Sequence, residues 1–315
     1  MPLVPSVSGS LDTALLGPTL MHEHVIARSP GVIENFPTVW DRNAEIEHAT
    51  ETLRSAKDGG VQTIVDLTTA DLGRDVRFVR EVAERSGMQV IVATGIWWDV
   101  PRYFHNRPVE VAADLFIRDI MTGIQDTGIK AGIIKCATDV AGVTRPIETI
   151  LRASARAHRA TGVPISTHTY AAGQMGLKQQ EIFAEEGVDL SRVIIGHSGD
   201  SEDLDYLKQL MERGSTIGMD RFGIDRILDT ERRCKVIAEL CRQGYAGRMV
   251  LSHDTNCYFD SIPEEIRRER MPNWHYLHIH QVVLPRLREL GVSEEQIDQM
   301  LFRNPRALFE QQGAY

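Results

Sequence analysis

The feature that most constrains the fold is a repeated alternation of short apolar runs with longer amphipathic stretches. Eight runs rich in β-branched residues recur along the chain, at 19–25, 62–69, 89–97, 131–139, 162–169, 192–200, 215–222 and 248–255. Helical patterns lie between many of them, at 43–60, 75–87, 145–162, 176–187, 201–214 and 229–244. Strands that alternate with helices indicate a parallel sheet, and near-continuous apolar strands indicate a sheet covered on both faces.

Eight such units favour a closed (β/α)8 TIM barrel over an open sheet. We expect a single domain over residues 1–315, because such barrels run to about 250 residues as one domain and no linker or internal repeat interrupts the pattern. A short N-terminal extension, 1–18, precedes the first strand. A long loop, 256–277, follows the eighth strand and carries few strand or helix signals, and the tail 293–309 predicts two short closing helices.

Charge and cysteine usage narrow the class of protein. The net charge of −9 argues against a nucleic-acid-binding surface, which would be basic. No apolar run is long enough to span a membrane, and the first residues lack the basic and apolar regions of a secretory signal. The four cysteines include no CxxC pair, so we expect reduced thiols and a cytoplasmic protein: Cys136, Cys234, Cys241 and Cys257.

Metal-binding side chains stand at the carboxyl ends of several predicted strands, where a (β/α)8 barrel places its active site. His22 and His24 are two apart on the first strand and therefore point to the same side. His168, His197 and Asp254 end later strands. Imidazole and carboxylate groups suit zinc and similar divalent cations, so the set predicts a metal centre although each histidine alone is more often a core residue.

The other histidines stand on helices or loops, or next to Asp254 with the opposite strand parity. We interpret them as structural or solvated: His48, His105, His158, His253, His275, His278 and His280.

Lys135, at the end of the fourth predicted strand, has two interpretations. Burial beside divalent cations would lower its pKa, and a neutral amine can react with CO₂ to form an anionic carbamate that bridges two metals. Alternatively, it is a strand-end lysine that reaches solvent or pairs with a carboxylate. Its position alone leaves both open.

Six motifs follow one another in the order and at the spacings typical of a known family: HEH, GIIKC, STHT, IIGHSGD, GMDRFG and LSHD. From residue 9 to about residue 310, the chain resembles the phosphotriesterase family of the amidohydrolase superfamily, and most of all the phosphotriesterase-like lactonases. The resemblance implies two divalent metal ions, with zinc favoured over cobalt, manganese or iron. It assigns His22, His24 and Asp254 to the more buried ion, His168 and His197 to the more exposed one, and carboxylated Lys135 to the bridge.

The same resemblance implies roles around the metals. Asp254 would be catalytic as a proton acceptor. Arg221 of GMDRFG would lie beside it as a catalytic and substrate-binding residue with Asp200 as its partner, and this chain of charges could orient Asp254 and pass protons outward. Many lactonases carry a tyrosine at the position of Trp97, whereas true phosphotriesterases carry a tryptophan there. Trp97 would form an apolar wall. The 256–277 loop would be a lid over the substrate, with an apolar face of Tyr258, Phe259, Ile262, Ile266, Met271 and Trp274, of which Tyr258, Phe259 and Trp274 are the expected substrate contacts.

The family also suggests a homodimer, through residues 1–18 and the segment 36–40. The function that these residues favour is hydrolysis of small-molecule lactones, above all N-acyl-homoserine lactones (quorum quenching), with weak phosphotriesterase activity. The alternatives are a true phosphotriesterase, a hydrolase of other γ- or δ-lactones, and a catalytically silent metal-binding scaffold. The scaffold would require a missing ligand or base, and none is missing. Amide or imide hydrolysis is a further alternative, although its usual mononuclear enzymes lack the lysine of GIIKC.

Overall fold

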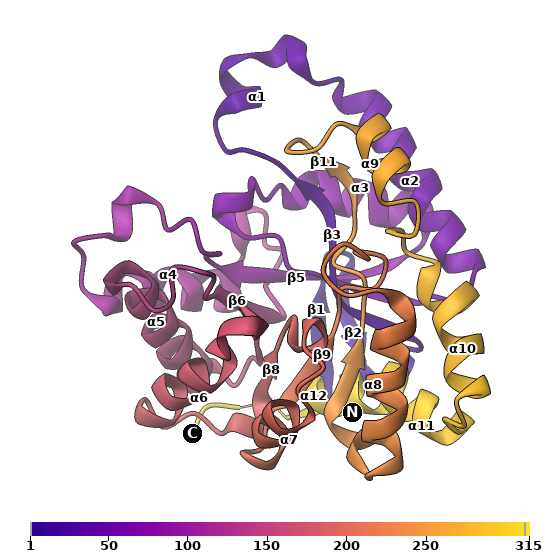
Figure 1. The fold of residues 1–315 in the computed structure, drawn as a ribbon. Helices are drawn as coiled ribbons and strands as arrows, with labels where there is room; N and C mark the ends of the chain where they lie inside the picture. Colours follow the sequence, from indigo (N-terminus) through magenta and orange to yellow (C-terminus); the bar gives the residue numbers. More distant parts are fainter. Residues whose placement is uncertain (1, 312) are drawn as a thin grey trace.

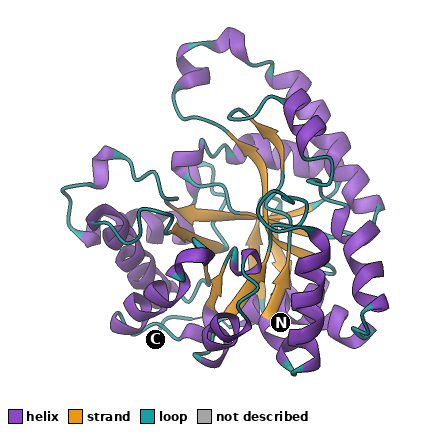
Figure 2. Ribbon diagram, in the orientation of Figure 1, coloured by secondary structure: helices purple, strands orange, loops and turns teal. Residues whose placement is uncertain are grey.

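A computed structural model describes residues 2–311 and 313–315. Its centre is a curled sheet whose strands run parallel, surrounded by helices (Figures 1 and 2). The strands follow chain order around the sheet: β3 (Thr19–Ala27), β4 (Thr63–Asp66), β5 (Gln89–Gly95), β6 (Ile133–Ala137), β7 (Ile165–His168), β8 (Val193–Ile195), β9 (Thr216–Met219) and β10 (Met249–Leu251). The predicted (β/α)8 barrel is therefore confirmed.

The barrel closes where the segment after β10 meets β3. The backbone N–H of Asp254 donates to the carbonyl of His22 at 3.0 Å, and the N–H of His24 donates to the carbonyl of Thr255 at 2.8 Å. A ninth strand, β11 (Asn256–Phe259), then pairs in parallel with the second half of β3. Two strands that are distant in sequence thus lie side by side at the barrel mouth.

Helices cover the outside of the barrel (Figure 2). The principal ones are α2 (Arg42–Asp58), α3 (Val76–Ser86), α4 (Val109–Met121), α5 (Arg145–Thr161), α6 (Met175–Glu185), α7 (Leu204–Glu212), α8 (Thr230–Arg242) and α10 (Leu284–Glu289). Carboxylates cap several of them, since Asp203 accepts from the first turn of α7 and Asp229 from that of α8. The six helical stretches singled out from the sequence agree with the structure within a few residues, and α4 is a further helix that was not among them.

The N-terminal extension forms an antiparallel hairpin, β1 (Leu3–Ser6) and β2 (Gly9–Asp12). The chain ends in α11 (Glu294–Asp298) and α12 (Asn304–Glu310), joined by the π-helical turn η11 (Gln299–Arg303), in agreement with the two predicted closing helices. Val4 of the hairpin and Phe309 of α12 belong to the apolar cluster inside the barrel. Both ends of the chain therefore contribute to one core.

The segment 256–277 is more regular than the sequence indicates. It contains β11 and a short helix, α9 (Glu264–Arg270), where we expected a loop with few strand or helix signals. The expectation failed for α9 because no residue of this helix is buried, so its charged sequence carries no apolar periodicity. Another small helix, α1 (Val32–Asn35), follows β3 at the top of Figure 1.

Among the described residues, every helix is too short or too polar to cross a lipid bilayer. The four cysteines are buried and free.

Candidate active site

Two imidazoles from β3 enter the barrel mouth from the same side of the strand, as their spacing predicts. His22 and His24 are both buried, and each points its Nε2 atom at a carboxylate oxygen of Asp254, at 3.3 and 3.2 Å. Asp254 follows β10 with a backbone φ of +57°. A left-handed backbone is uncommon outside glycine and often marks a functional position, and here it turns the carboxylate toward β3.

The second pair of imidazoles comes from the opposite part of the barrel. His168 ends β7, whereas His197 lies beyond the end of β8 with φ +58°, so the predicted strand 192–200 is too long. The Nδ1 atom of His168 lies 2.9 Å from the Nε2 atom of His197. Burial lowers the pKa of His168 to about 4 and holds that of His197 well below its usual range, so both rings are neutral.

Lys135 lies among the four imidazoles and Asp254, and these six side chains form what we call the floor of the site. Its side chain is 1% exposed, and its Nζ atom lies 2.9 Å from the Nε2 atom of His22. Burial lowers the pKa of Lys135 to about 8. The structure therefore brings all six predicted ligands together, and it does not place Lys135 at the surface.

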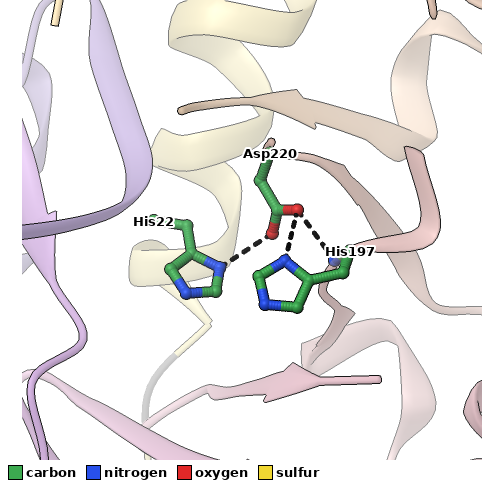
Figure 3. A group of neighbouring side chains, drawn as sticks. All are labelled: His22, His197 and Asp220. Carbon is green, nitrogen blue, oxygen red and sulfur yellow. Dashed lines mark hydrogen bonds and ion pairs between the residues drawn. The ribbon is translucent and has the colours of Figure 1, made fainter. Parts of the chain in front are cut away.

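Asp220 is a residue that the sequence analysis missed. It lies directly after β9, and its carboxylate stands between the rings of His22 and His197 (Figure 3). One oxygen accepts from Nδ1 of His22 at 2.8 Å, and the other accepts from Nδ1 of His197 at 3.0 Å. Burial would raise the pKa of Asp220, but the two imidazoles outweigh it and hold the pKa well below its usual range.

These partners determine which nitrogen of each ring carries the proton. An ionised carboxylate only accepts hydrogen bonds, so His22 and His197 are protonated on Nδ1, and their Nε2 lone pairs point into the site. His168 donates from Nε2 to Asp139 at 2.7 Å, which leaves its own lone pair on Nδ1. Two lone pairs thus face each other across the 2.9 Å between His168 and His197. Inward lone pairs beside a carboxylate are the donor set that a divalent cation requires, so these residues fit a metal centre.

Glu23, between the two histidines of β3, holds the segment that carries Asp254 in place. Its carboxylate accepts from the hydroxyl of Ser252, from the backbone N–H and Nδ1 of His253, and from the N–H of Thr255. These bonds hold the residues on both sides of Asp254. Burial raises the pKa of Glu23 to about 8, although these donors act in the opposite direction.

Charged side chains form a row behind Asp254. Arg221 donates from Nε to Asp254 at 3.0 Å and from Nη1 to Asp200 at 2.9 Å, as the sequence analysis expected. The row continues to Arg233 of α8, which was not predicted and which donates to the other Asp200 oxygen at 2.7 Å. Burial would raise the pKa of Asp254, but His22, His197 and Arg221 hold it well below its usual range.

A cavity of about 270 Å³ opens above this floor. Its walls include the expected residues Trp97, Phe259 and Trp274, together with other apolar side chains: Ala27, Leu72, Ile224, Ile227, Ile262 and Met271. Arg221 lines the floor, and the exposed Arg226 lies at the rim.

Tyr258 does not line this cavity, which corrects its assignment as a substrate contact. Successive residues of β11 point to opposite faces, so Phe259 faces the cavity while the ring of Tyr258 packs 6.0 Å from that of Trp40. Ile266 of the expected lid face also lies elsewhere, exposed on α9.

The remaining histidines lie away from the walls of the cavity. His253 is buried and bonded on both nitrogens, donating to Glu23 and accepting from the N–H of Ile279 at 3.0 Å. His158 is held by the carbonyl of Val163 at 2.7 Å. Structural roles for these two histidines agree with our interpretation.

The barrel and this site define a class of protein: a metal-dependent hydrolase whose reaction centre lies at the carboxyl ends of the barrel strands.

Comparison with known proteins identifies the family. The model of the phosphotriesterase family matches residues 2–309, so the chain belongs to that family, within the amidohydrolase superfamily. A phosphotriesterase homology protein of Mycobacterium tuberculosis is 51% identical over the full length of both chains. A solved structure of the phosphotriesterase from Mycobacterium tuberculosis, also 51% identical and fully covered, superposes with a TM-score of 0.98.

More distant relatives carry different activities in their names. An aryldialkylphosphatase of Saccharolobus solfataricus is 39% identical, covering 95% of this chain and 97% of its own. An N-acetyltaurine hydrolase of Dictyostelium discoideum is 29% identical, covering 84% of this chain and 73% of its own. Relatives of this chain are therefore named for phosphoester and for amide substrates.

Proposed function

We propose that this hydrolase uses two metal ions to open lactone rings, with N-acyl-homoserine lactones as the preferred class. The observation that carries the proposal is the convergence of four imidazoles, one lysine and Asp254 at the floor of an apolar-walled cavity. His22, His24 and Asp254 would hold the more buried cation, and His168 and His197 the more exposed one.

Lys135 would serve both cations as a carbamate. Its buried amine lies 2.9 Å from the ring nitrogen of His22, so a carbamate formed there would supply anionic oxygen ligands beside these imidazoles. We propose zinc as the metal, since imidazole and carboxylate oxygen suit it, with cobalt, manganese and iron as substitutes. Growth or reconstitution with ¹³C-bicarbonate should give a carbamate NMR signal that is lost in Lys135→Met; its absence from active, metal-loaded enzyme would contradict the bridge.

The two cations would polarise the lactone carbonyl and lower the pKa of a water from 15.7 to about 7. Asp254 accepts the proton of the attacking water and delivers it to the leaving alkoxide, which stays tethered as the ring opens. Arg221 orients Asp254 by donating to its outer oxygen at 3.0 Å. A guanidinium between two carboxylates keeps its proton, so the row Asp254, Arg221 and Asp200 fixes geometry rather than conducting protons.

The cavity walls support an amphiphilic substrate. Phe259, Ile262 and Met271 of the segment after β10 line the cavity together with Leu72 and Ile227. Each methylene of an acyl tail that is buried there contributes about 0.8 kcal/mol. A lactone with an apolar tail therefore gains more binding energy than a small polar lactone.

A second candidate is phosphotriester hydrolysis. Trp97 is a donor-only indole that cannot accept a hydrogen bond, and its Nε1–H donates to Nδ1 of His168 at 3.2 Å. It offers a substrate an apolar wall, which suits an aryl ester, and the 39% identical relative is named aryldialkylphosphatase. Relatives named N-acetyltaurine hydrolase make an amide substrate a third class to assay.

The deciding experiment measures kcat/KM on matched substrates. An acyl-homoserine lactone, a γ-lactone, a δ-lactone, paraoxon and N-acetyltaurine are compared on metal-loaded enzyme. We expect the acyl-homoserine lactone to be turned over fastest, Asp254→Asn to be inactive on every substrate, and Asp203→Asn, a helix cap outside the site, to be unaffected. A higher kcat/KM on paraoxon or N-acetyltaurine would overturn the lactone assignment.

Two further expectations belong to this proposal. We propose a homodimer through the N-terminal extension and the segment 36–40, where Leu15, Phe36 and Val39 are exposed. Light scattering at several concentrations, with Phe36→Ser as the disruptive variant, tests it; a wild-type monomer would contradict it. We also propose a cytoplasmic location, which four free buried thiols fit.

A further inference from the structure

One carboxylate beside the site is unused by the mechanism above. Asp139 follows β6, four residues after Lys135, and its Oδ2 atom accepts from Nε2 of His168 at 2.7 Å. It was not among the site residues predicted from the sequence. His168 is buried, whereas the side chain of Asp139 is about 25% exposed, so this contact lies at the open side of the floor.

Two independent contacts fix the proton of His168. The indole N–H of Trp97 only donates, so the nitrogen that it meets, Nδ1 at 3.2 Å, carries a lone pair. The carboxylate of Asp139 only accepts, so Nε2 on the other side of the ring carries the hydrogen. Both contacts require the same tautomer, with the lone pair on Nδ1, the atom that lies 2.9 Å from Nε2 of His197.

A tight turn holds Asp139 in place. Its Oδ1 atom accepts from the backbone N–H of Val140 at 2.6 Å, and its carbonyl accepts from the N–H of Gly142 at 2.7 Å. Gly142 has φ +70°, a conformation that glycine adopts without strain. Because Oδ1 is occupied by Val140, only Oδ2 faces the ring of His168.

We propose that Asp139 is a positioning residue for hydrolysis, which sets the tautomer and ring orientation of His168 so that Nδ1 faces the more exposed metal position. Asp220 serves His22 and His197 in the same way, and the hydroxyl of Thr68 contacts Nδ1 of His24 at 2.9 Å. The inference rests on the proposed function only for the metal that His168 would hold.

Substitutions at this position distinguish positioning from bulk support. In Asp139→Asn, the amide oxygen is needed by Val140, so the NH₂ group faces the N–H of His168 and favours the wrong tautomer. In Asp139→Ala, a water molecule can accept from the ring instead. The nearly isosteric Asn variant should therefore release metal more readily and have a lower kcat than the Ala variant. Loss of packing alone would give the reverse order. Asp139→Glu, which retains an acceptor, should recover part of the loss.

The first readout needs no metal. Long-range ¹H–¹⁵N spectra of histidine-labelled, chelator-treated protein should show His168 protonated on Nε2 in the wild type and shifted toward Nδ1 in Asp139→Asn. The signal is assigned by its loss in His168→Gln. An unchanged tautomer in Asp139→Asn would overturn the inference, whatever the metal content of the enzyme.

The second readout is metal release to a chelator, with kcat and KM measured on the reloaded enzyme. We expect one of two metal ions to dissociate about 10- to 100-fold more readily in Asp139→Asn, and kcat to fall more than KM rises. Asp203→Asn is the matched control, because within the described residues the hydrogen bonds of that carboxylate go to the first turn of α7 and to Gln174. Equal release of both ions by wild type and variant would contradict the role of Asp139, whereas a single ion in the wild type would contradict the two-metal proposal.

Discussion

Arg233 offers a direct test of how a buried charge stabilises the barrel mouth. This arginine of α8 is 1% exposed, and its guanidinium donates to the carbonyls of Leu228 at 2.9 Å and Gly199 at 2.5 Å, and to Asp200 at 2.7 Å. Replacing it by methionine keeps most of the apolar volume and removes every donor. Two buried carbonyls lose their partners, and Asp200 keeps only Arg221.

The expected cost follows from these contacts. Each orphaned buried acceptor costs about 1–3 kcal/mol, and breaking a buried ion pair costs about 3–5 kcal/mol, partly relieved here because Asp200 retains one arginine. The low ends of these figures together come to about 5 kcal/mol, and the arginine that Asp200 retains reduces this, so we expect Arg233→Met to lower the free energy of unfolding by about 3–5 kcal/mol. Equilibrium unfolding in urea, on metal-loaded protein with coincident fluorescence and circular dichroism transitions, measures the difference.

The neighbouring residue supplies the control. Arg232 stands on the same helix but is exposed, and its ion pair with Glu202 is at the surface. Arg232→Met should leave the urea midpoint within error. If Arg233→Met behaved like Arg232→Met, the reasoning that the row behind Asp254 is held by satisfied buried charges would be refuted.

Three further predictions concern other parts of the fold. Asp220→Asn should weaken metal binding about 10- to 100-fold, read by chelator competition, because its NH₂ group would oppose the ring N–H of His22 or His197; undiminished affinity would refute the role of this carboxylate. Gly95→Ala should destabilise the fold by about 1–3 kcal/mol in the same urea assay, since its Cβ would lie 1.9 Å from the carbonyl oxygen of Lys135; an unchanged midpoint would contradict this close approach. Burial would raise the pKa of Glu186, but two arginines of α5 outweigh it and lower the pKa. This contribution to stability is complete above about pH 4.3 and is lost as pH falls through the folded-state pKa, so Glu186→Gln should flatten the acid side of a calorimetric stability curve, and an identical acid limb would count against it.

The fold was predictable because its signals are local. Apolar runs of a few residues and amphipathic stretches repeat without interruption, and the parallel strands they imply must end at one edge. His22, His24, Lys135 and His168 do lie together at that edge, as predicted. Strand ends were less predictable, since His197 and Asp254 leave the strand geometry through positive φ values that the sequence does not display.

The missed residues share a physical cause. Asp220 acts on His22, 198 positions away, and nothing in its own surroundings in the chain reveals that partner. Asp139 likewise acts across the sheet on His168. Tyr258 was misplaced because the 256–277 segment was treated as one apolar face, whereas β11 alternates its side chains between two faces.

The shared core of the two chain ends has a consequence for synthesis. Val4 from the first strand and Leu308 and Phe309 from the last helix pack in one cluster inside the barrel. A ribosome-bound chain lacks Leu308 and Phe309 until synthesis has passed residue 309, and until then the interior is without these two side chains. The core of the barrel is therefore complete only when residues as far along the chain as Phe309 have been made, and chaperones would meet an incomplete barrel with an uncovered interior before that point.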